Sequence, residues 1–269
     1  MLENPRSPRV RAVAKLTKRA GRVETGLFLL EGPQSVSEAL QWRPEGVVEL
    51  FGTPTAFEKH PQIAEAAEAA GVPTVFVTED VLNAMADTVT PQGLVAVAQQ
   101  FPSSVKDIFA DGPRLIAICE EVRDPGNLGT IIRAADAAGA DAVVLTGRTV
   151  DLYNPKVVRA TTGSLFHLPI SVGGDLVSVR ERARAAGLRI IAADVKGDDL
   201  LEARASGVLA EPTAWLFGNE AHGLDDESLA LADLALRLPI YGSAESLNLA
   251  TAASVCLYES AFAQRAATQ

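Results

Sequence analysis

Residues 238–259 read LPIYGSAESLNLATAASVCLYE, and this stretch sets the architecture of the second half of the chain. It begins as the end of an apolar strand, passes through a loop of small residues and ends in a helix. Pro239 and Gly242 end the strand, and Ser246 is predicted to cap the helix that follows. Such a loop presents backbone N–H and C=O groups around leucine side chains. It therefore predicts a pocket that holds a flat purine without a charged residue.

Upstream of this stretch, apolar segments of strand length alternate with helical patterns. The strands are expected at 115–119, 142–145, 166–172, 188–193, 214–217 and 234–238. Helices are expected at 128–138 and 176–186, and another begins where Asn154 caps a first turn that contains Pro155. This alternation predicts an α/β domain with a parallel sheet over residues 113–269.

The first hundred residues repeat the alternation on a smaller scale. A helix at 8–21 is followed by expected strands at 27–30, 47–51, 75–77 and 94–98, with helices between them. This pattern predicts an α/β sandwich over residues 1–100. Residues 101–112 contain Pro102, two serines and Gly112, which favour a linker between the two domains.

Charge is distributed unevenly along the chain. The formal net charge is -10, yet residues 1–22 contain seven arginine and lysine residues against Glu3 alone, so this segment carries +6 and the remainder carries -16. A basic leader on an acidic body is consistent with an RNA-binding footprint, in which Arg9, Arg11 and Lys15 are candidate contacts. A solvated helix face remains an alternative.

Composition also bears on the compartment of the protein. No apolar run approaches the roughly 20 residues that span a bilayer, and the N-terminus is polar and basic. Cys119 and Cys256 lie in apolar contexts without metal-ligand spacing, so we expect free buried thiols and a cytoplasmic protein. The three histidines are scattered, and no metal site is expected.

A first candidate site is EEVRDPGNLGTIIR at 120–133, between an apolar strand and a helix. Pro125 and Gly126 favour a turn, Asn127 is predicted to cap the helix, and Arg133 is expected to project back toward the same edge of the sheet. The carboxyl edge of a parallel sheet is where α/β proteins bind ligands. The spacing matches neither a dinucleotide fingerprint nor a P-loop. An ordinary strand–turn–helix with a surface arginine is the alternative.

Two further stretches share this character. LFGNEAHGL at 216–224 follows another strand, and Gly218 is expected to let the chain turn over a ligand. A glycine-bounded connection with a solvated Glu220 is the simpler interpretation. KVVRATTGS at 156–164 places Lys156 and Arg159 on one helix, for which a solvated helix end is the simpler interpretation.

Together with Glu245-Ser246-Leu247-Asn248, the stretches at 120–133 and 216–224 resemble, in order, the three motifs of the SpoU (TrmH-like) RNA 2′-O-methyltransferases of the SPOUT class. The string FLLEG at 28–32, followed by EAL at 38–40, resembles the substrate-binding domain that precedes many SpoU catalytic domains. That domain is related to a small ribosomal protein that binds RNA kinks. The resemblance implies an N-terminal RNA-binding domain and a C-terminal domain whose tail forms a trefoil knot.

The resemblance also implies an activity, which is methyl transfer from S-adenosylmethionine to a ribose 2′-hydroxyl. The additional substrate domain favours ribosomal RNA over transfer RNA as the target, and transfer RNA stays open as the alternative. The residues that it assigns to the cofactor pocket are Gly218, Leu238, Leu247 and Asn248, and those that it assigns to catalysis are Arg133, Asn127 and Glu220. Arg159 would reach a substrate phosphate across the interface of a homodimer. We expect this interface on the apolar C-terminal helix, through Leu247, Leu249, Val255 and Leu257.

Two alternatives stay open. Arg133 is either the base or a stabiliser of the developing oxyanion, and a guanidinium keeps its proton to pH values above about 12. The chain has Ala250 where the family often has serine, so a hydroxyl role would pass to Ser246, Thr251 or the backbone. This departure is the only support for a rival function, a non-catalytic RNA-binding or ribosome-associated protein that retains the fold.

Overall fold

The computed structural model describes residues 1–267 and divides into two compact units. Unit 1 comprises Met1–Phe101 together with Asp151–His167, and unit 2 comprises Pro102–Val150 together with the chain from Leu168 onward. The sequence placed all of 113–269 in one domain. The packing instead groups Asp151–His167 with unit 1, because the ring of Tyr153 lies 4.7 Å from that of Phe28 and its hydroxyl accepts a hydrogen bond of 2.7 Å from the backbone N–H of Phe101.

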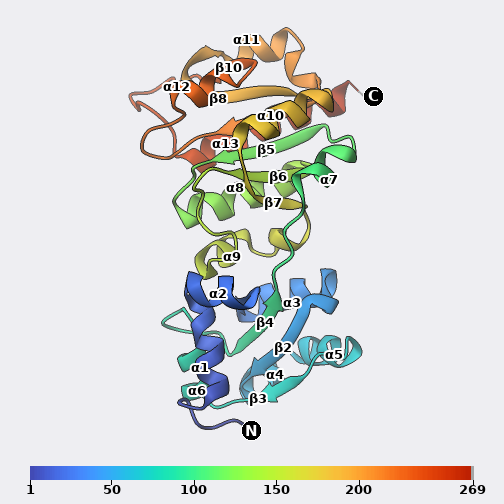
Figure 1. The fold of residues 1–269 in the computed structure, drawn as a ribbon, viewed down its shortest axis with the longest axis vertical. Coiled ribbons are helices and arrows are strands. Elements are labelled where there is room, and N and C mark those ends of the chain that lie inside the picture. Colours follow the sequence, from blue (N-terminus) through green and yellow to red (C-terminus); the bar gives the residue numbers. More distant parts are fainter. Residues whose placement is uncertain (268–269) are drawn as a thin grey trace. The chain divides into compact units, whose positions relative to one another are not determined.

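Unit 1 contains a mixed sheet. Its strands, in spatial order, are β1 (Leu27–Glu31), β4 (Leu94–Gln99), β2 (Val47–Gly52) and β3 (Thr74–Phe76). β4 is antiparallel to both of its neighbours, and β2 and β3 are parallel. The helices are α1 (Pro8–Ala14), α3 (Gly32–Trp42), α4 (Pro54–Lys59), α5 (Pro61–Ala69), α6 (Glu79–Met85) and α9 (Pro155–Thr161). Figure 1 traces them in blue to cyan, with α9 in yellow-green.

One face of this sheet is covered by α1 and α6. Val10 and Val13 of α1 join Leu29, Phe51 and other strand residues in one buried cluster. Because successive strand residues point to opposite faces, their neighbours Leu30 and Leu50 point to the other face of the sheet. The predicted α/β character of this part of the chain is therefore observed.

The basic leader is not one helix. The chain forms α1, a 3₁₀ turn at Lys15–Thr17 and a second helix, α2 (Arg19–Thr25), with Lys18 in an extended conformation between them. Gly21 explains the tight packing, because a Cβ atom there would lie 2.3 Å from the carbonyl oxygen of Lys15. Arg22 is buried, so the leader exposes one cation fewer than its sequence suggests.

Unit 2 contains a parallel sheet, as predicted. Its strands, in spatial order, are β10 (Leu234–Arg237), β8 (Arg189–Asp199), β9 (Thr213–Phe217), β5 (Leu115–Glu120), β6 (Ala142–Thr146) and β7 (Ile170–Gly174). Every pairing between neighbours is parallel. The strand order runs outward in opposite directions from the adjacent strands β5 and β9, so a topological switch point lies between them.

Helices cover both faces of this sheet (Figure 1). Those on one face are α7 (Val105–Ala110), α10 (Leu176–Ala185) and α12 (Asp226–Ala230), which share an apolar cluster with the strands. On the other face α8 (Pro125–Ala138) packs against α13 (Leu249–Ala266), and Trp215 of β9 donates a hydrogen bond to Ser260 of α13. The short helix α11 (Leu200–Ala205) follows β8.

Three local predictions differ from the structure. The segment predicted as a linker contains α7, whose Ile108 and Phe109 are buried in the core of unit 2. The strand expected at 166–172 begins only at β7, after a 3₁₀ turn at Ser164–Phe166. β8 continues past residue 193 because β10 pairs with it again at Asp198 and Asp199. The two backbones approach closely at Gly197, where a Cβ atom would lie 2.4 Å from the carbonyl carbon of Ala235.

Candidate functional site

The loops that follow β5 and β9 form the centre of the candidate site. The two strands are neighbours in the sheet and are parallel, so both loops leave from the same carboxyl edge. The loop after β5 contains the stretch 120–133, and the loop after β9 contains the stretch 216–224. The sheet therefore brings together two motifs that lie almost a hundred residues apart.

Glu220 links the two loops. Its carboxylate accepts hydrogen bonds from the backbone N–H groups of Arg123 (3.1 Å) and Asp124 (2.9 Å), and from the side-chain amide of Asn127 (3.3 Å). A carboxylate that accepts consecutive N–H groups fixes the course of the loop that carries them. The sequence's simpler interpretation, a solvated glutamate, is therefore incomplete.

Asn127 extends this contact to the third motif. Its side-chain oxygen accepts a hydrogen bond of 2.9 Å from the side-chain amide of Asn248. Glu220, Asn127 and Asn248 thus form a continuous hydrogen-bond chain. We call it the motif chain, and it connects one residue from each of the three motifs.

Two helix caps differ from the sequence prediction. Asp124, not Asn127, caps α8, because its carboxylate accepts the N–H of Asn127 at 2.8 Å. Asn248, not Ser246, caps α13 by accepting the N–H groups of Ala250 and Thr251. Both helices begin at different residues from those expected, which leaves the amide of Asn127 available to Glu220.

The loop after β9 is closed on itself. Asn219 and Gly223 exchange backbone hydrogen bonds of 3.0 and 2.9 Å, and the side-chain amide of Asn219 donates to the carbonyl of Glu121. A Cβ atom at Gly218 would lie 2.6 Å from the carbonyl group of Gly223 and 2.7 Å from the nitrogen of Leu224. Gly218 is thus required by the protein's own backbone, which the sequence interpretation of a ligand-facing glycine did not anticipate.

Two carboxylates at this edge have opposite pKa shifts. Burial tends to raise the pKa of Glu220, but the hydrogen bonds from Arg123, Asp124 and Asn127 outweigh it and hold the pKa below its ordinary value. The pKa of Glu120 is raised, first by burial and then by repulsion from Glu121 and Asp225. One carboxylate oxygen of Glu120 is buried without a hydrogen-bond partner. The sequence analysis did not identify Glu120 as a site residue.

A cleft of about 820 Å³ lies between the two loops. Its lining residues are Glu120, Glu121, Arg123, Asp124, Pro125, Asn219, Glu220, Ala221, His222, Gly223, Leu224, Asp225 and Ser228. It includes Glu220 but none of the four residues predicted for the cofactor pocket. The motif chain connects the cleft to the expected cofactor segment, because Glu220 lines the cleft and Asn248 belongs to that segment.

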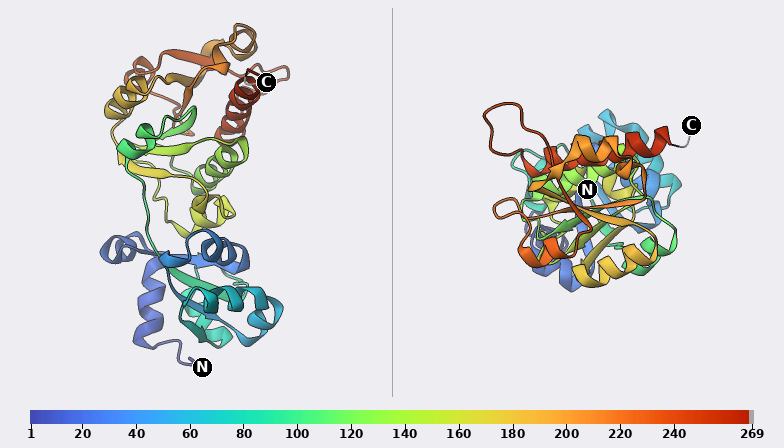
Figure 2. Two further views of the ribbon diagram at one scale, coloured as in Figure 1. Left: turned by 90° about the vertical axis from the view of Figure 1, so that its right-hand side faces the viewer. Right: turned by 90° about the horizontal axis from the view of Figure 1, so that it is seen from above.

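That segment, residues 238–248, has a large exposed apolar surface. Ile240, Tyr241 and Leu247 are 38%, 85% and 42% exposed, and Leu238 is partly buried. Figure 2 shows the segment as the orange-red loop before α13. Such apolar surface, next to the amide of Asn248, fits a ligand that combines a flat apolar ring with polar groups.

Arg133 lies on α8 and is exposed. Among residues 1–267 its guanidinium has no hydrogen bond or ion pair, in contrast to most arginines of the chain. An exposed, unpaired guanidinium on the helix that carries Asn127 is available to an anionic ligand.

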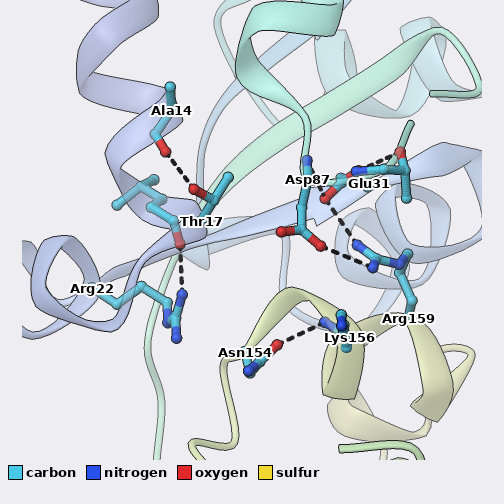
Figure 3. A network of polar contacts seen from close by, with 10 residues as sticks. Ala14, Thr17, Arg22, Glu31, Asp87, Asn154, Lys156 and Arg159 are labelled. Atoms are coloured by element: carbon cyan, nitrogen blue, oxygen red, sulfur yellow. Dashed lines mark hydrogen bonds and ion pairs between the residues drawn. The ribbon is translucent and has the colours of Figure 1, made fainter. Parts of the chain in front are cut away.

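The predicted RNA contacts of unit 1 have different environments. Arg11 and Lys15 are exposed, whereas Arg9 is ion-paired with Glu49. Arg159 is ion-paired with Glu31 and Asp87, both at 3.0 Å (Figure 3). Arg22 pairs with Asp151 at 2.6 Å and donates to the carbonyl of Leu16, so it is a structural residue.

Other expected features concern metals, thiols and membranes. Within the described part of the chain, no cluster of three histidine, cysteine or acidic side chains has a metal-binding arrangement. Cys119 and Cys256 are free and buried, as predicted, and burial raises the pKa of each thiol to about 12. None of the helices formed by residues 1–267 has the length and apolarity to cross a bilayer.

Comparison with known proteins matches most of the chain. Residues 114–258 match the SpoU rRNA Methylase family, and residues 7–96 match the MRM3-like substrate binding domain. The 23S rRNA (guanosine(2553)-2′-O)-methyltransferase RlmP of Bacillus subtilis is 35% identical, over 96% of this chain and 97% of its own length. The 23S rRNA (guanosine-2′-O-)-methyltransferase RlmB of Bordetella pertussis is 32% identical, over 86% of this chain and 96% of its own length.

Solved structures agree with these relatives. The SpoU methyltransferase AviRb of Streptomyces viridochromogenes, in complex with AdoMet, is 30% identical with a TM-score of 0.83, and the match covers 97% of this chain and all of that one. An AdoMet-bound rRNA methyltransferase of Sinorhizobium meliloti is 33% identical with a TM-score of 0.81, over 96% of both chains.

Proposed function

Because the chain belongs to the SpoU rRNA methylase family, we propose that it transfers the methyl group of S-adenosylmethionine to a ribose 2′-hydroxyl of 23S ribosomal RNA. The observation that carries this proposal is the motif chain, in which Asn248, Asn127 and Glu220 join the three motif loops at the carboxyl edge of the sheet. An ordinary strand–turn–helix does not require such a connection between distant segments.

The residues of unit 2 fit S-adenosylmethionine. The exposed apolar side chains of 238–248 suit its adenine ring, and Gly218 holds the neighbouring loop in its closed course. We assign Gly218, Leu238, Leu247 and Asn248 to the cofactor pocket, partly through the loops that they shape. When bound, this cofactor supplies an electrophilic sulfonium methyl group.

Methylation of a ribose requires help from the protein, because a 2′-hydroxyl is a poor nucleophile. The guanidinium of Arg133 is unpaired within the described chain, and as a cationic donor it stabilises the developing negative charge on the ribose oxygen. Glu220 and Asn127 act by holding the loop at 123–127 in place. Asn248 caps α13, so the start of this helix does not depend on a hydroxyl at position 250, and a catalytic hydroxyl would come from Ser246 or Thr251.

Unit 1 supplies the RNA-binding surface in this proposal. The match to a substrate-binding domain at residues 7–96 supports this role, and Arg9, Arg11 and Lys15 of the basic leader are the proposed contacts. In functional terms we divide the chain into a substrate-binding domain (1–100), a connection (101–112) and a methyltransferase domain (113–269). The packing of Asp151–His167 on unit 1 then brings a methyltransferase segment into the RNA-binding unit.

We further propose a cytoplasmic homodimer with a trefoil knot at its C-terminal end. The knot rests on the family resemblance. The dimer is supported by α13, where Val255 and Phe262 are exposed, seven residues apart and therefore on one helix face. Leu257 was expected in this interface, but it is fully buried within its own chain and cannot contribute.

Mapping of methyl groups tests the proposal directly. The purified chain is incubated with S-adenosylmethionine labelled at its methyl group and with unmodified 23S ribosomal RNA, with transfer RNA as the control. We expect a 2′-O-methylated nucleoside in the digested ribosomal RNA by mass spectrometry. Absence of cofactor binding at millimolar concentration would favour the rival, a non-catalytic RNA-binding protein.

A further inference from the structure

Arg159 is held by two carboxylates in unequal environments (Figure 3). One terminal nitrogen, Nη1, lies 3.0 Å from Glu31, whose side chain is only 4% exposed. The other, Nη2, lies 3.0 Å from Asp87, whose side chain is 26% exposed. The guanidinium therefore has a buried partner and an outer partner.

The buried partner is fixed by further contacts. Glu31 also accepts the backbone N–H groups of Asp87 (3.0 Å) and Thr88 (3.1 Å), and the hydroxyl of Thr88 (2.8 Å). Removing Arg159 from Glu31 would leave a buried charge without its cation, which is costly. Glu31 thus holds Arg159 in position.

The outer partner has fewer constraints. Among the described residues, the Asp87 carboxylate has Arg159 as its one ion-pair partner, and the backbone N–H of Asp87 remains bound to Glu31 whichever way the side chain points. Lys156 lies three residues before Arg159 on α9, on the same side of the helix, and is exposed. An anion that reaches this place meets two cations once Asp87 moves away.

We propose that Asp87 occupies the place of an RNA phosphate on Arg159 and that bound substrate RNA displaces it. This inference rests on the proposed function, since it specifies how the same RNA is selected. A phosphate that is correctly placed by the rest of the RNA replaces the Asp87 carboxylate on the outer nitrogen. An RNA held only loosely has to compete with a carboxylate that is already in position, so Asp87 acts as a specificity-determining residue.

The test compares two charge-matched variants of unit 1. Asp87→Asn removes the competing charge, whereas Asp80→Asn removes an exposed charge on α6 that, within residues 1–267, forms no ion pair. Both change the net charge equally, so both share any general electrostatic gain. We expect Asp87→Asn to bind an unmodified 23S ribosomal RNA transcript about threefold to fivefold tighter than Asp80→Asn, the upper range for releasing a partly exposed ion pair.

A second pair of variants tests whether the gain acts through Arg159. In an Arg159→Gln background, Asp87→Asn and Asp80→Asn should bind RNA equally well, because the group that receives the phosphate is absent. Thermal unfolding checks that each protein is folded. If Arg159→Gln does not fold, the comparison of the two single variants decides the matter.

The outcomes separate this inference from the function on which it rests. Equal affinity of Asp87→Asn and Asp80→Asn, or weaker binding by Asp87→Asn, would overturn the role of Asp87. A gain that persists in the Arg159→Gln background would overturn it as well. If the role of Asp87 failed in this way while the unaltered chain methylated RNA normally, the proposed methyltransferase function would still hold. An unaltered chain that binds no RNA would overturn both the role of Asp87 and the proposed function.

Discussion

Glu220 in unit 2 and Glu31 in unit 1 each hold a distant loop through hydrogen bonds, but their surroundings differ. Each carboxylate accepts two consecutive backbone N–H groups from a loop that is distant in sequence, namely Arg123 and Asp124 for Glu220, and Asp87 and Thr88 for Glu31. Each therefore fixes a loop that the local sequence does not fix.

The two carboxylates differ in burial and in their remaining partner. Glu31 is almost fully buried and is neutralised by Arg159, whereas Glu220 is exposed at a cleft and has the neutral amide of Asn127 as its third donor. A buried charge with a cation serves mainly to hold structure, and an exposed carboxylate tied to a motif chain serves to shape a site. Changes at Glu31 should thus affect stability first, and changes at Glu220 should affect activity first.

Among the variants that bear on this pair of carboxylates, the largest effect is expected from Gly218→Val, which displaces the loop that carries Glu220. The new side chain would lie against the backbone of Gly223 and Leu224, so the loop must move. Because displacements of about 1 Å at a reaction centre cost roughly 100-fold in rate, we expect at least this loss of methyl transfer. Gly46→Val in unit 1 is the matched control, since a Cβ atom there meets no atom within 4 Å. Equal activity of the two variants would show that the close approach at Gly218 does not matter for methyl transfer.

Glu220→Gln should lower the methyl-transfer rate by about tenfold to 100-fold, since hydrogen bonds to a charged acceptor are replaced by weaker ones. The fold should persist, as judged by circular dichroism. Since the pKa of Glu220 is lowered in the folded protein, the carboxylate stabilises the loop above its ordinary pKa of 4.5, and this contribution is lost as the pH falls through the lowered pKa. The variant should lack that acid-dependent loss. An unchanged rate would show that Glu220 is a solvated surface residue.

Glu31→Gln should have the opposite profile. Loss of the buried charge beside Arg159 is expected to reduce the free energy of unfolding by about 1–3 kcal/mol. The affinity for S-adenosylmethionine, a property of unit 2, should not change. Chemical denaturation and calorimetry measure the two quantities. If Glu31→Gln lost affinity for S-adenosylmethionine but kept its stability, Glu31 would act on the cofactor site rather than on the stability of unit 1.

The sequence predicted the parts of this comparison that depend on local pattern. Apolar periodicity identified β5 and β9, and the motif at 216–224 identified Glu220, because strand–loop–helix order is readable from neighbouring residues. Glu31 lies in the stretch 28–32, whose sequence shows a family resemblance but no pattern that predicts the partners of its carboxylate. Its partners are 56 to 128 residues away, so only the folded chain reveals them.

Caps and boundaries were less predictable for a related reason. Ser246 and Asn127 are suitable caps by residue type, but Asn248 and Asp124 occupy those positions because packing decides where each helix begins. The segment at 101–112 has the composition of a linker, yet Ile108 and Phe109 find a place in the core of unit 2. The composition of a segment shows which conformations it can adopt, and its tertiary contacts select the one that it adopts.

The smallest effect is expected at Glu120, which lines the same cleft as Glu220. Its raised pKa means that the charged form is disfavoured in the folded protein, so its contribution to stability falls as the pH rises through that pKa. Glu120→Gln should therefore stabilise the protein at neutral pH, by less than about 1 kcal/mol because the carboxylate is only partly buried. Thermal unfolding of both proteins at pH 5 and pH 8 checks this. A melting temperature at pH 8 that is lower for Glu120→Gln than for the unaltered chain would contradict it.

The proposed role of Arg133 is to stabilise the reacting ribose oxygen through its exposed guanidinium. The most direct measurement is the single-turnover rate of methyl transfer to 23S ribosomal RNA by Arg133→Ala, with cofactor and RNA saturating. We expect a loss of about 100-fold to 1000-fold, the usual effect of removing one oxyanion-stabilising group, with unchanged affinity for S-adenosylmethionine. Methyl transfer at the rate of the unaltered chain would contradict it.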